Sequence, residues 1–215
     1  MSPIMRTGID RVFGGGLSPA EAVKRILADV QNKGDAALRH YSAAFDGKAP
    51  NDFEVEKGVW VEAFEMLEPA LQDALTLAAE QITSFHTKQL RTSWIDFNEE
   101  GALGQMVRPL ERVGIYTPSG TAVYPSSLLM TAIPARVAGV SEIIVCAPQM
   151  ADGHVSPLIL AAAKIAKVDR LFQLGGAQAI GAMAYGTESV PSVDKICGPG
   201  NIFVVLAKRE VYGTV

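Results

Sequence analysis

Short apolar segments alternate with helical stretches from about Glu111 to the end of the chain, and this alternation is the strongest constraint on the fold. The segments RVGIYTP, EIIVCAP, RLFQL and VDKI have the length of single strands. Strands that alternate with helices at this spacing form right-handed βαβ units and a parallel sheet. The sequence therefore predicts an α/β fold with a parallel, Rossmann-like sheet.

Four helices are expected between and after these strands. Pro134 should kink or break the first of them, because proline lacks an N–H group and its ring collides with the preceding turn. Ser156 and Pro157 are typical of the cap and first position of the second helix. The four stretches are YPSSLLMTAIPARVAG, SPLILAAAKIAKV, AQAIGAMAYG and NIFVVLAKRE.

The preceding half of the chain is predicted to be mainly helical. Residues 18–21 form a capping box with proline at the first helical position, and Gly34 should end the helix that follows. Asp35 can cap a second helix, and a longer one follows Pro69. WIDFNEEGALGQMVRPL is typical of a hairpin with its turn near residues 98–101. We therefore divide the chain into a helical N-terminal segment, 1–108, and a Rossmann-like domain, 109–215.

Charge and hydropathy exclude several kinds of partner. The net charge of −4 comes from 19 basic and 23 acidic residues without any Lys/Arg run, which disfavours nucleic acid and anionic membranes. No apolar run approaches the roughly 20 residues that span a bilayer, and the first residues lack the apolar core of a signal peptide. We expect a cytoplasmic globular protein.

Cysteine and histidine are too scattered for a disulfide scaffold or a zinc site built within this chain. Cys146 and Cys197 lie far apart in the sequence, no CxxC occurs, and His40, His86 and His154 are isolated.

Three predicted strand-to-helix turns are rich in glycine or proline, at residues 117–120, 175–178 and 197–201. Glycine lets a ligand approach the backbone closely, and the free N–H groups at the next helix favour an anion such as phosphate. One such turn is commonly a tight connection, but three at the carboxyl edge of one parallel sheet favour a binding site. Tyr116, Gln178 and Asn201 are the side chains expected to converge there.

Several other polar or reactive residues have structural interpretations that we favour. Cys197 could be a nucleophile near a helix N-terminus, but such a cysteine more often fills space beside a glycine. Asp46 in AFDG is typical of a turn residue. Lys208 and Arg209 suit the negative end of the last helix dipole.

Three longer stretches resemble histidinol dehydrogenases: GDAALRHYSAAFDG, ERVGIYTPSGTAVYPSSLLMTAIPARVAG and GGAQAIGAMAYGTESVPSVDKICGPGNIFVVLAKREV. The resemblance runs from about residue 18 to the end. It implies a cytoplasmic, zinc-dependent homodimer that oxidises L-histidinol to L-histidine through histidinal, with two NAD molecules used in succession. By motif, the NAD contacts would be Tyr116, Gln178 and Asn201.

Two departures from the family pattern matter. Ser119 stands where the family usually has a second glycine, so the first turn should differ slightly. The family's zinc ligands and its Glu-His acid/base pair match no residue of this chain, so no catalytic or metal residue is assigned. We therefore expect an N-terminal fragment, inactive alone, whose first 108 residues belong to a domain completed by later sequence and expose an apolar face.

Two other functions stay open on the residues alone. One is an aldehyde-dehydrogenase-like enzyme with Cys197 as nucleophile, although no general base is evident. The other is a binding module that keeps the nucleotide site without catalysis.

Overall fold

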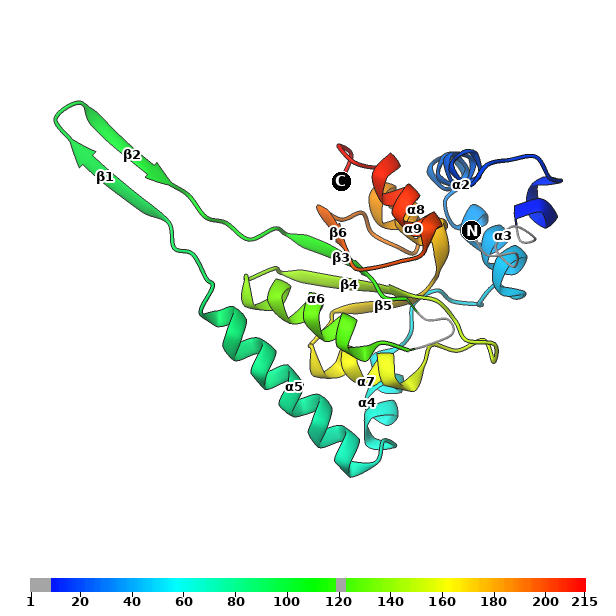
Figure 1. Ribbon diagram of the computed structural model, residues 1–215, viewed down its shortest axis with the longest axis horizontal. Coiled ribbons are helices and arrows are strands. Elements are labelled where there is room, and N and C mark those ends of the chain that lie inside the picture. Colours follow the sequence, from blue (N-terminus) through cyan, green and yellow to red (C-terminus); the bar gives the residue numbers. More distant parts are fainter. Residues whose placement is uncertain (1–8, 119–122) are drawn as a thin grey trace.

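A four-stranded parallel sheet lies at the centre of the protein, in the order β5-β4-β3-β6 (Figure 1). The structure is a computed structural model that describes residues 9–118 and 123–215. The strands are β3 (Arg112–Tyr116), β4 (Glu142–Ala147), β5 (Arg170–Gln173) and β6 (Lys195–Cys197). This architecture confirms the predicted α/β class with a parallel sheet.

Helices cover both faces of the sheet, and each face has its own apolar cluster. Along β4, Ile144 and Cys146 point to one cluster while Ile143 and Val145 point to the other, as the two-residue period of a strand requires. The first face carries α2 (Pro19–Lys33), α3 (Asp35–Asp46), α8 (Gly176–Tyr185) and α9 (Ile202–Glu210). The second carries α4 (Lys57–Glu65), α5 (Pro69–Thr87), α6 (Pro125–Val137) and α7 (Pro157–Ile165).

Helices from both halves of the sequence share these clusters. In the first cluster α2 packs on α8 and α9, and in the second α4 packs on α7. The division at residues 108 and 109 stays a prediction.

The helices α2, α5 and α7 begin at the positions that the sequence predicts, but the capping bonds differ from those expected at α3 and α7. The Ser18 hydroxyl accepts from Glu21 N at 3.3 Å and the Glu21 carboxylate accepts from Ser18 N at 2.8 Å, so the capping box is confirmed. Asp35 does not cap α3, since it is the first helical residue and its N–H donates to the distant Glu188 carboxylate at 2.7 Å. Ser156 precedes α7 but its hydroxyl makes no capping bond.

Two further departures concern helix α6 and helix α4. Pro134 lies inside α6 without ending it. The loss of one backbone hydrogen bond is tolerated there because Leu128, Leu129 and Ile133 are buried against the sheet. Helix α4 was not anticipated, because only Trp60 and Ala63 form its buried face.

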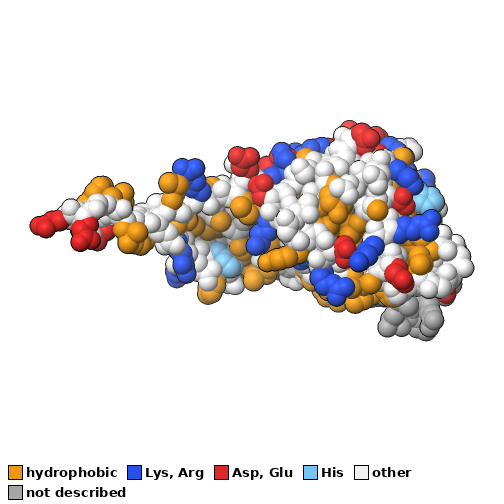
Figure 2. All heavy atoms as spheres, turned by 90° about the horizontal axis from the view of Figure 1, so that it is seen from above, with side chains coloured by type: hydrophobic (Ala, Val, Ile, Leu, Met, Phe, Trp, Pro, Cys, Tyr) orange, Lys and Arg blue, Asp and Glu red, His pale blue; other side chains and the backbone are white. Residues whose placement is uncertain are grey.

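The predicted hairpin is confirmed as β1 (Trp94–Asn98) paired antiparallel with β2 (Gly101–Gln105). It projects from the rest of the protein, and all ten strand residues are exposed (Figure 1). Figure 2 shows hydrophobic side chains along this arm and acidic ones at its tip. Phe85 of α5 is exposed as well, which agrees with the expected apolar face. No described helix is both long and apolar enough to cross a membrane.

Candidate functional site at the carboxyl edge of the sheet

The strand order reverses between β3 and β6. The chain moves from β3 through β4 to β5 in one direction and then returns to form β6 on the other side of β3. The helices α6 and α7, which connect β3 to β4 and β4 to β5, lie on one face of the sheet. The helix α8, which leads from β5 to β6, lies on the other face. In such sheets a ligand binds outside the carboxyl ends of the strands where the order reverses. Two of the three glycine-rich turns, those after β3 and β6, flank this point.

Tyr116 ends β3 and lies almost completely buried at this edge. Its hydroxyl accepts a hydrogen bond from Gly176 N at 3.2 Å, which joins the end of β3 to the start of α8. Burial raises the pKa of Tyr116 to about 12, with a smaller contribution from the negative charge of Asp46. The hydroxyl therefore stays neutral near pH 7 and has its proton left to donate to a ligand.

Gln178 lies one turn into α8, next to the same contact. A Cβ atom on Gly176 would lie 2.6 Å from Gln178 Oε1, and Gly176 has a φ of +67°, so only glycine suits this position. Gln178 is 1% exposed, and its Oε1 has no hydrogen-bond partner within the described part of the chain. A buried amide oxygen without a donor is costly, and this one fits a ligand that supplies a donor.

The turn after β6 packs directly on Tyr116. Gly198 has a φ of +106°, and a Cβ atom there would lie 2.0 Å from the Tyr116 carbonyl oxygen. Asn201 begins α9 as its N-cap, and its Oδ1 accepts from Phe203 N at 3.0 Å and Val204 N at 3.2 Å. Asn201 is exposed, so its Nδ2 group can donate to a ligand while its oxygen holds the helix.

The structure thus brings Tyr116 and Gln178 together at Gly176, and it places the Asn201 turn against the Tyr116 backbone. Ser119, the expected departure in the first turn, lies outside the described residues. Three residues of this region were not among the expected contacts. They are Thr117, Asp46 and Lys208.

The sequence predicts the positions of these three residues to different degrees. Thr117 is fully buried and its Oγ1 has no partner among the described residues, a property that no sequence pattern reveals. Lys208 lies in the last turn of α9, as expected, and its ammonium group also donates to the Gly198 carbonyl oxygen at 3.1 Å, which the sequence did not predict. Asp46 is the last residue of α3, so its place at a turn is as expected.

The cysteines give no support for a nucleophile or a metal centre. Cys146 is fully buried, and burial raises the pKa of its thiol well above the usual range. Cys197 is half-buried and packs against the cluster on the second face. Residues 9–118 and 123–215 contain no group of three or more His, Cys, Asp or Glu side chains placed to hold a metal ion.

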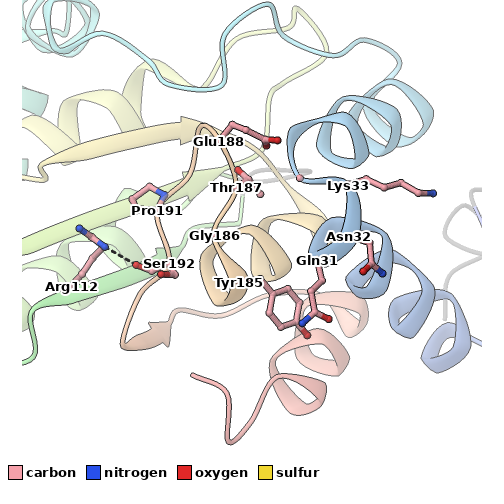
Figure 3. Close-up of a pocket in the computed structure, with 11 residues that line it drawn as sticks. Gln31, Asn32, Lys33, Arg112, Tyr185, Gly186, Thr187, Glu188, Pro191 and Ser192 are labelled. Carbon is pink, nitrogen blue, oxygen red and sulfur yellow. Dashed lines mark hydrogen bonds between the residues drawn. The ribbon is translucent and has the colours of Figure 1, made fainter.

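A hollow with a volume of about 650 Å³ lies at the opposite edge of the sheet, near the amino-terminal ends of β3 and β6 (Figure 3). Arg112 in its wall donates to the Ser192 carbonyl oxygen at 2.9 Å, and Glu188 accepts from Asp35 N. These charged groups are therefore already bonded to protein atoms. Glu188 holds the start of α3 against the loop before β6, and Arg112 holds that loop against β3.

Comparison with known proteins shows to which family the chain is similar. A family model described as histidinol dehydrogenase matches residues 17–215. The chain is 52% identical over 200 residues to the histidinol dehydrogenase of Lactiplantibacillus plantarum, covering 93% of this chain and 46% of that protein. The histidinol dehydrogenase of Methanosarcina mazei is 53% identical over 201 residues, covering 92% and 46%.

A solved structure gives the same result. The crystal structure of histidinol dehydrogenase from Elizabethkingia anophelis matches with a TM-score of 0.87 at 34% identity, covering 93% of this chain and 46% of that one. The chain spans about half the length of the curated relatives it matches.

Proposed function

Because the chain belongs to the histidinol dehydrogenase family, we propose that it supplies the NAD-binding part of an enzyme that oxidises L-histidinol to L-histidine through histidinal. This is the last stage of histidine biosynthesis, and the proposed enzyme works in the cytoplasm as a homodimer. The observation that carries the proposal is the Oε1 of buried Gln178 beside the Tyr116–Gly176 contact, which has no hydrogen-bond partner among residues 9–118 and 123–215. This pair lies near the switch point, where sheets of this topology bind nucleotides.

Each of the three assigned side chains has a separate task. The Tyr116 hydroxyl would donate a hydrogen bond to the cofactor, and Gln178 would accept one through Oε1. Asn201 donates from Nδ2 while its Oδ1 keeps α9 capped. The glycines at 176 and 198 leave room for a close approach of the ligand. The chemistry that bound NAD would supply is an acceptor for the hydride that leaves the substrate carbon.

The residues of this chain do not fit a zinc site, because the described part contains no suitable ligand group. We therefore derive no step through a metal and assign no acid or base. It follows that residues 1–215 should bind NAD but not turn over histidinol without the rest of a histidinol dehydrogenase chain.

Calorimetric titration with NAD tests the site. We expect the wild-type chain to bind and Asn201→Ser to bind more weakly, because serine keeps the helix cap and removes the amide donors. No binding to wild type would make the proposal wrong. Equal affinity of the two proteins would make the assignment of Asn201 wrong.

Absorbance of NADH tests catalysis. Histidinol and zinc added to this chain with NAD should give no signal, and sustained turnover would contradict the proposed inactivity. Oxidation of an aldehyde that is abolished by alkylating Cys197 would instead support the aldehyde-dehydrogenase-like alternative.

A further inference from the structure

The projecting hairpin and its two connecting segments, residues 91–108, form a unit that we call the arm. Its strands β1 and β2 form a sheet only with each other in the described part of the chain, and all ten strand residues are exposed (Figure 1). The Ser93 hydroxyl accepts a hydrogen bond from Val107 N at 2.8 Å, which holds the two segments together below the strands. A two-stranded sheet of this size is at best marginally stable alone in water. The arm is therefore a structure that gains stability from a partner.

One face of the arm is apolar. Residues that lie directly opposite each other in an antiparallel pair share a face. Ile95 lies opposite Gly104 and Phe97 lies opposite Ala102, so these four residues form one surface, which we call the apolar face. Ile95 is 62% exposed and Phe97 is 73% exposed. The carboxylate of Asp96 interrupts the other face. An exposed apolar surface of this kind is typical of a site of protein association.

The two ends of the arm carry opposite charges. Arg91 and Arg108 are its basic residues and lie at its base, whereas Glu99 and Glu100 form the turn at its tip. All four side chains are exposed, and none of them takes part in an ion pair within residues 9–118 and 123–215. Figure 2 shows the acidic side chains at the tip. The arm therefore offers a partner one negative end and one positive end.

A second copy of the chain has the complementary arrangement. If two arms lie antiparallel about a two-fold axis, the tip of each meets the base of the other, and the two contacts are identical by symmetry. Ile95 lies four residues from Arg91 and four from Glu99, so the axis passes through the apolar face. If the arms instead lay parallel, acidic tips would meet acidic tips and repel each other. The charges thus favour one alignment of two arms.

We propose that the arm is a self-association surface, on which two copies of this chain pair antiparallel with apolar face on apolar face and acidic tip against arginine base. This inference rests on the homodimer of the proposed function and not on the NAD site. It assigns the contact between the two copies to residues 91–108.

Analytical ultracentrifugation of the 215-residue chain tests this pairing. Wild type should sediment as a dimer, with twice the 22.9 kDa mass of one chain. Phe97→Ser should raise the dissociation constant by about tenfold or more, because the largest side chain of the apolar face is lost. Met66→Ser is the matched control, since Met66 is 86% exposed at the end of α4, away from the arm, and it should leave the dissociation constant unchanged.

Charge reversal tests the alignment. The double substitution Glu99→Lys/Glu100→Lys makes both ends of the arm basic, and Arg91→Glu/Arg108→Glu makes both ends acidic. Each variant alone should be a monomer, because its tips and bases repel each other. An equimolar mixture of the two should form a heterodimer, since every tip again meets a base of opposite charge.

A control with the same change of net charge separates this effect from general repulsion. Glu62 and Glu65 are exposed on α4, and Glu62→Lys/Glu65→Lys should stay a dimer. Circular dichroism checks that all variants are folded. If a charge-reversed variant does not fold, the comparison of Phe97→Ser with Met66→Ser still decides whether the arm pairs.

The outcomes separate this inference from the proposed function. A monomeric wild type would overturn the pairing, whether or not the carboxyl-terminal half of a relative binds the chain. A dimer that Phe97→Ser and the charge reversals do not weaken would show that another surface pairs, and only the role of the arm would be wrong. Monomeric variants that give no heterodimer on mixing would overturn the antiparallel alignment. NAD titration of the wild type is independent of all these results, so a failure to bind NAD would overturn the proposed site and leave the arm as assigned.

Discussion

The Nζ atom of Lys208 donates a hydrogen bond of 3.1 Å to the carbonyl oxygen of Gly198. This contact links the third turn of α9 to the loop that precedes the same helix. The loop is also fixed on its other side, because Gly198 lies against the Tyr116 backbone. Lys208 is half-buried, so its ammonium group is partly withdrawn from solvent.

Lys208→Met should therefore loosen the 198–201 turn and weaken NAD binding. We expect about a fivefold loss of affinity, which corresponds to about 1 kcal/mol for one hydrogen bond. Arg209→Met is the control, since Arg209 is exposed in the same helix end and should leave the affinity unchanged. Titration with NAD measures both. An equal affinity of Lys208→Met and wild type would show that the contact does not support the site.

Gly198→Ala should be among the most destabilising single substitutions at this edge. The added Cβ would collide with the Tyr116 carbonyl oxygen at 2.0 Å and would also occupy a left-handed φ of +106°. We expect a loss of about 3 kcal/mol or more in the free energy of unfolding, measured by urea denaturation.

Gly153→Ala separates strain from collision. Gly153 has a φ of +85° with no atom within 4 Å of an added Cβ, so only the backbone strain remains. Its expected cost is about 1 kcal/mol. Equal losses at the two positions would contradict the close packing of the 198–201 turn on β3.

Gln178→Met should separate stability from ligand binding. The substitution removes a buried amide whose Oε1 has no partner among the described residues, so the ligand-free chain should lose less than about 1 kcal/mol. NAD binding should nevertheless fall by about tenfold or more, because the acceptor is gone. Thermal unfolding and titration give the two values.

Gln173→Met should behave in the opposite way. The side chain of Gln173 donates to the Asp52 carbonyl oxygen at 2.6 Å and accepts from Gln149 at 3.0 Å. Its loss should destabilise the chain by about 1 to 2 kcal/mol and leave NAD binding unchanged. A loss of binding only in Gln173→Met would reverse the assignment of the two glutamines.

Local signals in the sequence were enough to predict the parallel sheet, the hairpin and the capping box of α2. They also placed Tyr116 and Gln178 at the edge where the structure brings them together. The α3 cap was missed because its acceptor, Glu188, lies 153 residues from Asp35. The contact between Lys208 and Gly198 was also missed, because it depends on how the turn folds back along α9. Tertiary contacts of this kind have no periodicity and no local composition that a sequence could reveal.

Asp46 also predicts how stability depends on pH. Burial raises its pKa from 3.8 to about 6 in the folded chain, so between these values the folded state holds more protons than the unfolded one. The free energy of unfolding must then fall as pH rises from about 4 to about 6. Asp46→Asn removes this group, and the variant should be more stable than wild type above pH 6 with little difference near pH 4. Urea denaturation of both proteins at pH 4, 5, 6 and 7 isolates the contribution of Asp46, because the other titrating groups are common to both. A difference in stability that does not change with pH would show that Asp46 has an ordinary pKa in the folded chain.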